Sequence, residues 1–423
     1  MIAYGMARSL LRSVQAVGSG IRTGWLLLGI TLILIIVCEL GLRLALTTRD
    51  RLMDRQPPTE GEYENRLVQA DAYRDAAWVH EYFKERNKAR RSVWSPYVYW
   101  QGAPHRSRYI NTNQNGLRAT WNPPTRDGAD DPPPVRVFTF GGSTMWGWGA
   151  RDDYTIASHL GKLLHAKGYR AEVTNHGQFG YVSTQEAIAL LRCIQRGDVP
   201  DIVLFYDGIN DVFSAHQNGA AGIPMNEVVR RAEFRLSLSW RPKQLARIYG
   251  RGFLIKNLWG FHRLVTGLQH RIRPQASPHT GSQVPVLSDE VVRQAVRVYQ
   301  TNLTLVESLG RGYGFDPLFY WQPIIFSKRH RSPWEEILAG FAFSTKQAYD
   351  TIYRRVRQSE SLNSHPRFRN ISALFDDSGE PYYVDQFHHL SEAGNRRVAA
   401  AIADDVIELI EQRRAAAKEK RML

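Results

Sequence analysis

The sequence has little cysteine and no cysteine pattern that binds a metal. Only two cysteines occur, Cys38 inside an apolar run and Cys193 far along the chain in a helical pattern. A structural disulfide between them is implausible, so the cysteine count leaves the redox compartment open. No CxxC or other zinc spacing is present, and neither an internal repeat nor a nucleic-acid-binding module is visible. We therefore expect no cofactor and no nucleic-acid partner.

Acidic residues are fewer than basic ones. The 423 residues include 55 Lys and Arg against 41 Asp and Glu, a formal net charge of +14. Such a balance suits an anionic lipid, an acidic substrate or nucleic acid. The chain is 43% apolar and 23% charged, which argues against wholesale disorder and allows a sizeable core.

Much of the excess charge lies in one segment. Between Val228 and Pro274, eleven Lys or Arg residues accompany a single acid, Glu233, with aromatic residues interspersed. We interpret this segment as part of an insertion at about 212–288. It is either a solvated helical cap whose aromatics form a small core, or a surface for anionic lipid headgroups or an acidic glycan.

One long apolar run is present near the N-terminus. The stretch 24–46 reads GWLLLGITLILIIVCELGLRLAL, which is about the 20 residues that a bilayer-spanning helix needs. Glu39 and Arg43 interrupt it four residues apart, so they share a helix face and can pair near the interface. We predict one uncleaved transmembrane helix after a basic tail, 1–23. A cleaved signal peptide and a buried helix of a soluble protein are the alternatives.

The charges that flank the run orient it only weakly. Arg8, Arg12 and Arg22 precede it without an acid, whereas three arginines and two aspartates follow it closely. A short basic N-terminus before a long domain more often stays inside the cell. We expect a single-pass inner-membrane protein with its main domain on the periplasmic side.

Downstream, short apolar runs alternate with amphipathic segments. A linker and accessory segment at 47–134 precedes a domain at 135–414 and a short tail at 415–423. The predicted strands are Val135–Phe140, Ala171–Asn175, Asp201–Tyr206, Pro317–Trp321 and Ile371–Phe375. The predicted helices are Thr155–Lys167, Ser183–Arg196, Asp289–Leu309, Pro333–Gln358 and Ser391–Arg413. This alternation predicts an α/β fold with a doubly wound parallel sheet, whose site lies at the carboxyl ends of the strands.

A serine follows the first predicted strand. Ser143 stands in FGGSTMWGWG, after two glycines and before a helical pattern. A sharp turn of this kind exposes a nucleophile, and a helix N-terminus stabilises developing negative charge. By itself, the motif is more typical of a serine that caps a helix N-terminus than of a nucleophile.

Groups that could hold an oxyanion follow the next two strands. Gly177 and Gly180 lie in NHGQFGYVS and offer backbone N–H groups, and Asn210 in YDGIND offers a side-chain amide. Each motif alone is also typical of a common turn.

The last motif, YVDQFHHLSEAGN, carries Asp385, His388 and His389. A carboxylate here can orient an imidazole as a general base. The Asp-x-x-His spacing favours His388, whereas counting back from Gly394 favours His389; we prefer His388. A surface turn is one alternative, and a metal cluster of the three side chains is another. The cluster lacks a further ligand, so no metal is expected.

In this order the four motifs resemble the SGNH/GDSL hydrolase family, over roughly 135–414 apart from the insertion. The resemblance implies a flavodoxin-like three-layer sandwich with a five-stranded parallel sheet. It implies Ser143 as nucleophile, completed by Asp385 and His388, with an oxyanion hole formed by the N–H groups of Ser143 and Gly180 and the side chain of Asn210. The family's usual Gly-Asp-Ser is Gly-Gly-Ser here, as in a bacterial membrane-anchored branch with an FGGST motif. The stretches ELGLR, INTNQNGLR and YWQP also resemble that branch.

The resemblance predicts a serine esterase that acts on O-acyl esters, acetyl esters among them, of an envelope glycan or lipid. An O-acyltransferase of polysaccharide modification that uses the same residues is one alternative. A non-catalytic envelope scaffold and a metal-dependent hydrolase using Asp385 and His388 are others. Gln322 in YWQP either caps a strand or lines the cleft. The sequence indicates no oligomeric state.

Overall fold

The computed structural model describes residues 2–52, 65–124, 133–238, 250, 258, 260–261, 264, 287–341 and 343–422. The chain divides into two compact units. The first joins Met1–Thr59 to Arg231–Thr280, and the second joins Glu60–Arg230 to Gly281–Leu423. The predicted insertion therefore belongs in part to the N-terminal unit, and most of its residues lie outside the described ones.

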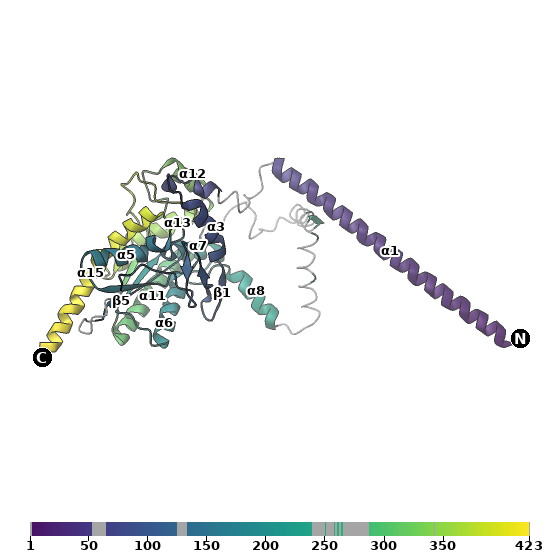
Figure 1. Cartoon of the computed structure of the whole chain (residues 1–423), viewed down its shortest axis with the longest axis horizontal. Helices are drawn as coiled ribbons and strands as arrows, with labels where there is room; N and C mark the ends of the chain where they lie inside the picture. Colours follow the sequence, from purple (N-terminus) through teal and green to yellow (C-terminus); the bar gives the residue numbers. More distant parts are fainter. Residues whose placement is uncertain are drawn as a thin grey trace. The chain divides into compact units, whose positions relative to one another are not determined.

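The first unit is dominated by one long helix, α1 (Ile2–Leu52). Its segment Arg22–Arg49 has a mean hydropathy of 2.5, and only 6% of its most apolar window is buried. Figure 1 shows α1 as one continuous helix. By length and composition it fits a membrane span or a signal sequence, and it contains the predicted span 24–46.

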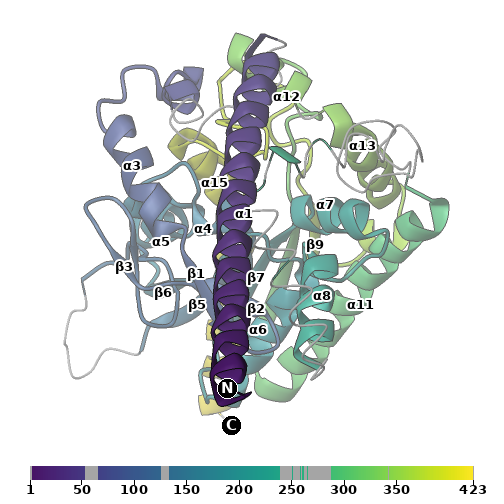
Figure 2. The same cartoon turned by 90° about the vertical axis from the view of Figure 1, so that its right-hand side faces the viewer.

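The second unit is built on a five-stranded parallel sheet. Its order is β6-β5-β7-β8-β9, which in chain order is 2-1-3-4-5, the flavodoxin-like order. The strands are β5 (Val135–Gly141), β6 (Ala171–Asn175), β7 (Ile202–Asp207), β8 (Asp316–Trp321) and β9 (Phe368–Asn370). Helices lie on both faces of the sheet (Figures 1 and 2). The predicted fold class is confirmed.

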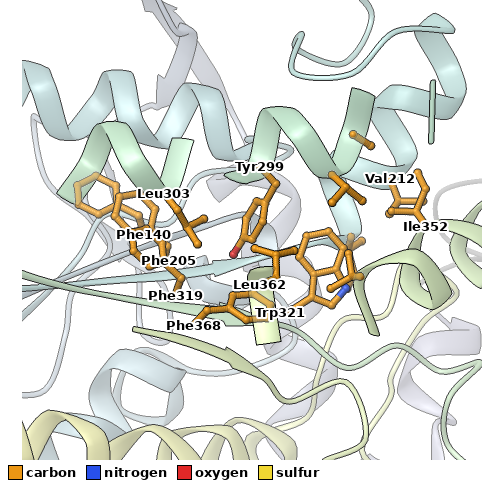
Figure 3. Close-up of a cluster of buried hydrophobic side chains, with 14 of the residues drawn as sticks. Phe140, Phe205, Val212, Tyr299, Leu303, Phe319, Trp321, Ile352, Leu362 and Phe368 are labelled. Atoms are coloured by element: carbon orange, nitrogen blue, oxygen red, sulfur yellow. The ribbon is translucent and has the colours of Figure 1, made fainter. Parts of the chain in front are cut away.

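Alternate residues of the central strands enter two separate cores. In β7, Val203 and Phe205 face one core while Ile202, Leu204 and Tyr206 face the other. The first core is covered by α6 (Ser183–Gln195), α7 (Ile209–Asn218), α11 (Asp289–Tyr313) and α13 (Phe343–Arg357). Figure 3 shows this core, with Tyr299 of α11 beside Trp321 of β8. The second core is covered by α5 (Ile156–Ala166) and α15 (Glu392–Met422). Burial on both faces explains why the strands read as continuous apolar runs.

Two predicted elements differ from the observed ones. The last strand is β9, and the stretch Ile371–Phe375 that was predicted as a strand forms turns, in which Leu374 N–H bonds to the carbonyl of Ile371. The prediction of one helix over Pro333–Gln358 is also wrong, because two helices occupy it, α12 (Pro333–Phe341) and α13. Other helices include α4 (Ser143–Trp146), α8 (Glu227–Leu238) and α14 (Glu360–Asn363), and short 3₁₀ helices occur at Asp71–Tyr73 and Asp152–Tyr154.

The accessory segment packs on the unit that contains the parallel sheet. It contains α3 (Val79–Ala89) and two small antiparallel pairs, β1 (Ser92–Ser95) with β2 (Tyr99–Gly102), and β3 (His105–Arg106) with β4 (Asn111–Thr112). A third apolar cluster joins residues of this segment, among them Tyr82, to Trp146 and Val384. The segment thus supports both the α4 turn and the loop that carries the predicted histidines.

Candidate active site

Ser143 is the first residue of α4 and follows the carboxyl end of β5 by two residues. The strand ends at Gly141, and Gly142 precedes the helix with an extended backbone. The side chain of Ser143 is partly exposed, whereas Thr144, Met145 and Trp146 after it are buried. The local structure therefore presents one hydroxyl at the strand end, as the motif predicts.

Gly142 allows Asn210 to lie against the serine turn. A Cβ at position 142 would overlap Nδ2 of Asn210. Any side chain there would displace the amide, so the glycine at this position is required by the position of Asn210. This gives a physical reason for Gly-Gly-Ser in this chain.

A chain of two hydrogen bonds joins Ser143 to the last motif. The Oγ of Ser143 lies 2.7 Å from Nε2 of His389, and Nδ1 of His389 lies 2.6 Å from Oδ2 of Asp385. Both distances are those of strong hydrogen bonds. The two ring nitrogens thus connect a hydroxyl on one side to a carboxylate on the other.

The preference for His388 is contradicted by this geometry. His388 does not contact Ser143: its Nδ1 accepts the N–H of Ile325 at 3.4 Å, and its ring packs 4.9 Å from Tyr349 and 5.3 Å from Phe326. Burial lowers the pKa of His388 to about 3, so the ring is neutral.

The backbone of the loop explains why the second histidine is selected. His388 has φ +65°, in the left-handed region, which turns the chain sharply before His389. The loop closes through the N–H of Val384 on the carbonyl of His389 at 3.0 Å and a bridge between Tyr383 and Leu390. This closure brings His389, four residues after Asp385, back beside its carboxylate.

Asp385 is held as an anion. Burial acts to raise its pKa, but the charge of His389, the hydrogen bond to that ring and two backbone N–H groups outweigh it and hold the pKa below its usual value. Those N–H groups are Phe387, 2.9 Å from Oδ1, and His389, 3.3 Å from the same atom. An ionised carboxylate at Nδ1 fixes the tautomer in which Nε2 accepts a proton.

Of the predicted oxyanion donors, Asn210 lies against the turn that carries Ser143. Asn210 donates an N–H to the carbonyl of Tyr181 at 2.9 Å, and its Nδ2 lies against Gly142. Gly180 has φ +69° and belongs to the turn that precedes α6. Within the described part of the chain, the backbone N–H groups of Ser143 and Gly180 donate to no acceptor. Gly177 instead supports the turn, because a Cβ there would overlap the backbone N of Trp146.

Sequence reasoning left Gln322 open and missed Arg118. The buried Oε1 of Gln322 accepts the hydroxyl of Thr144 at 3.0 Å, which ties the residue after Ser143 to the end of β8. The buried guanidinium of Arg118 donates to the carbonyls of Gly147 at 3.0 Å and Ala150 at 2.7 Å, and to Asp152 at 2.7 Å. An asparagine-rich stretch ending in Leu-Arg carried no signal of this role.

An aromatic stack backs His389. The ring of Trp148 lies 5.1 Å from that of His389, and the guanidinium of Arg86 lies 4.3 Å from the Trp148 ring. Arg86 is buried, and its Nε and Nη1 have no hydrogen-bond partner in the described part of the chain. The indole thus packs against the imidazole of His389 in addition to the two hydrogen bonds at its ring nitrogens.

Metal ligation is not indicated around this loop. Among the described residues, no group of three His, Cys, Asp or Glu side chains is arranged to hold a metal ion. His388, one member of the cluster considered from the sequence, points its Nδ1 at a backbone N–H.

The comparisons with known proteins add distant structural likenesses. No family model matches the chain, and no curated protein matches it. Among solved structures, the acetyl xylan esterase AlAXEase has 14% identity and a TM-score of 0.34, over 64% of this chain and 100% of that one. A carbohydrate acetylesterase family member from Sinorhizobium meliloti has 14% identity and a TM-score of 0.31, over 66% and 99%. A variant of an acetyl xylan esterase from Geobacillus stearothermophilus has 14% identity and a TM-score of 0.33, over 65% and 95%. Likenesses at this level do not identify an activity, which has to be argued from the site.

Proposed function

We propose that the protein is a serine esterase of the SGNH type that removes O-acyl groups, acetyl among them, from an envelope carbohydrate. The observation that carries the proposal is the hydrogen-bonded series Ser143, His389 and Asp385. A non-catalytic scaffold would not require a neutral-tautomer imidazole held between a hydroxyl and a buried carboxylate.

The reaction follows from the positions of the donors and acceptors. Nε2 of His389 takes the proton of Ser143 Oγ as the oxygen attacks the ester carbonyl. The resulting oxyanion is stabilised by the N–H groups of Ser143 and Gly180 and by the amide of Asn210. His389 then returns the proton to the leaving alcohol oxygen, which departs and leaves an acyl-serine. Water, deprotonated by Nε2 of His389, then attacks this acyl group. His389 returns the proton to Oγ of Ser143 as the bond to the acyl group breaks and the acid leaves.

A groove beside β6, lined by none of Ser143, His389 and Asp385, is where we propose that part of a carbohydrate carrier binds. A cavity of about 630 Å³ is lined by amide, hydroxyl and basic side chains of the accessory segment and β6, including Arg106, Asn111, Gln114 and Thr174. Such donors and acceptors suit sugar hydroxyls better than acyl chains. Gln114→Ala should raise KM for an acetylated polysaccharide and leave KM for p-nitrophenyl acetate unchanged; equal effects on both would remove the groove from the proposal.

We further propose that α1 anchors the enzyme in the inner membrane with its catalytic unit in the periplasm. The support is the apolar segment Arg22–Arg49, which is almost wholly exposed in the isolated chain. A C-terminal reporter active only outside the cytoplasm tests the orientation, and the mass of the mature protein tests whether the segment is retained.

Labelling with a fluorophosphonate probe tests the chemistry. The wild-type chain should be labelled, Ser143→Ala should not, and the control Ser288→Ala, at the exposed N-terminus of α11, should be labelled like wild type. Persistent labelling of Ser143→Ala would remove the assignment. Product analysis with and without a sugar acceptor separates hydrolysis from acyl transfer, since both pass through the same acyl-serine.

A further inference from the structure

The basic insertion contacts α1 through a carboxylate inside the apolar segment. Oε1 of Glu39 accepts the N–H of Gly260 at 2.7 Å, and Oε2 accepts the N–H of Phe261 at 3.0 Å. Arg43, one helical turn on, donates Nε to Oε1 at 2.6 Å. Glu39 is 4% exposed, whereas Leu40 beside it is 60% exposed. The insertion thus covers α1 at Glu39.

The backbones approach closely at this contact. A Cβ on Gly260 would lie 2.8 Å from Cβ of Leu42 and 3.1 Å from Oε2 of Glu39. Only glycine fits there without displacing the helix. Small residues of this kind allow close packing between helices in membranes, where packing and hydrogen bonds supply the attraction.

The contact supplies the carboxylate of Glu39 with hydrogen-bond donors that lipid does not offer. A carboxylate within a membrane span is costly unless it is paired, because hydrocarbon offers it no hydrogen-bond donor. Here two backbone N–H groups and Arg43 supply donors to both oxygens of Glu39. A cleaved signal peptide would take this acceptor away from Gly260 and Phe261, so the contact favours a retained α1.

The excess of basic residues in the insertion favours an anionic surface as its partner. Glu39 and Arg43 lie in the last three turns of Arg22–Arg49, at the end that leads into the rest of the chain. Eleven Lys or Arg residues between Val228 and Pro274 accompany one acid. Most of these charges lie outside the described residues, but the described Gly260 and Phe261 of the same segment contact Glu39 of α1. Basic residues attached near the end of a membrane span are attracted to anionic headgroups.

We propose that the basic insertion is a membrane-interface element, held on α1 by Glu39 and bound to anionic lipid headgroups on that side of the bilayer. The proposal rests on α1 being a retained membrane span and is independent of the esterase chemistry. The proposed partner of the insertion is the lipid surface. The backbone N–H groups of Gly260 and Phe261 attach the insertion to Glu39 of α1.

A fluorescent label on the insertion tests the location. In a Cys38→Ser, Cys193→Ser background, an environment-sensitive dye is placed at Leu264→Cys, and a matched one at Leu305→Cys, an exposed leucine of α11. The full chain is reconstituted in phosphatidylcholine vesicles with and without phosphatidylglycerol, both carrying nitroxide-labelled lipid. The Leu264 label should be blue-shifted and quenched, more so with phosphatidylglycerol, and the Leu305 label should not. Equal behaviour of the two labels, or quenching at Leu264 that ignores phosphatidylglycerol, would overturn the proposal.

The role of Glu39 is tested by a matched pair of substitutions. Glu39→Ala should reduce quenching of the Leu264 label to the level of the Leu305 label, and Leu40→Ala should leave it unchanged. Unchanged quenching in Glu39→Ala would contradict docking through this carboxylate. Fluorophosphonate labelling of the same samples reports on the esterase separately, and their mass shows whether α1 is present.

Discussion

Two histidines adjacent in the chain lie in opposite surroundings. His389 bridges a hydroxyl and a carboxylate, with contacts of 2.7 and 2.6 Å. His388 is enclosed by Tyr349 and Phe326, where burial lowers its pKa to about 3. The difference arises from one backbone angle, φ +65° at His388, which directs successive side chains to different sides of the loop. The surroundings of each imidazole are set here by backbone geometry, because the residue type is the same.

Two buried carboxylates repeat the contrast. Asp385 receives donors at both oxygens, and its pKa is lowered despite burial. Neither side-chain oxygen of Asp207, at the end of β7, has a hydrogen-bond partner of standard geometry among the described residues. Burial and then the charge of Asp211 raise the pKa of Asp207 to about 8. The environment of Asp385 therefore favours the ionised form, whereas that of Asp207 favours the protonated form.

The largest effect is expected from removing the hydroxyl of Ser143, which His389 contacts. Ser143→Ala should lower kcat/KM for p-nitrophenyl acetate by about 10⁴-fold or more, because no nucleophile remains. Steady-state kinetics with Ser288→Ala as control measures it. A loss of less than about tenfold would mean that Ser143 is not the attacking group.

The hydrogen bond between His389 and Asp385 is tested by removing the charge of Asp385. Asp385→Asn should lower kcat/KM by about 10³- to 10⁴-fold, since an amide at this position favours the wrong tautomer. The comparison variant is Asp377→Asn, on an exposed carboxylate whose side chain is 87% accessible. If the two variants have similar rates, Asp385 has no part in orienting the ring.

The site also depends on the absence of a side chain at position 142. Gly142→Ala should displace the amide of Asn210 and lower kcat by about 10²-fold, the usual effect of losing one oxyanion donor. Asn210→Ala should give a similar loss, and the double variant should lose little more than either single one. Additive losses would show that Gly142 acts by another route.

The two carboxylates predict opposite dependences of stability on pH. The raised pKa of Asp207 means that the folded state binds a proton that the unfolded state has lost, so this group's stabilisation declines as pH rises from about 4 to about 8. Asp385, with a lowered pKa, contributes stability above its ordinary pKa and loses it in acid. Urea unfolding at pH 5 and pH 8 should show a smaller loss for Asp207→Asn than for wild type. Parallel pH profiles would contradict a protonated Asp207.

Much of the fold and part of the site were predictable from local patterns. Apolar runs followed by glycine and polar residues marked β5, β6 and β7 with their catalytic-type side chains, including Ser143 and Asn210. β9 was misplaced because a strand of three residues has too short a pattern to separate from the turns after it. The choice between the histidines depended on one positive φ, which spacing does not encode.

Contacts between distant segments left no local signal. Arg118 holds carbonyls about thirty positions away, and Glu39 meets a backbone 221 residues further along the chain. Such partners are set by tertiary packing, which a single sequence does not display. Glu39 was assigned only its pairing with Arg43, which the structure contains at 2.6 Å.

The most direct test of the central claim is the rate of fluorophosphonate labelling of Ser143 in two variants with the same substitution, His389→Asn and His388→Asn. Asparagine tolerates the left-handed backbone at position 388, so both variants have a fair chance of folding. Labelling should fall by about 10³-fold or more in His389→Asn and by less than about tenfold in His388→Asn, whose thermal stability is the property expected to suffer. Loss of labelling in folded His388→Asn, with His389→Asn still labelled, would contradict the account.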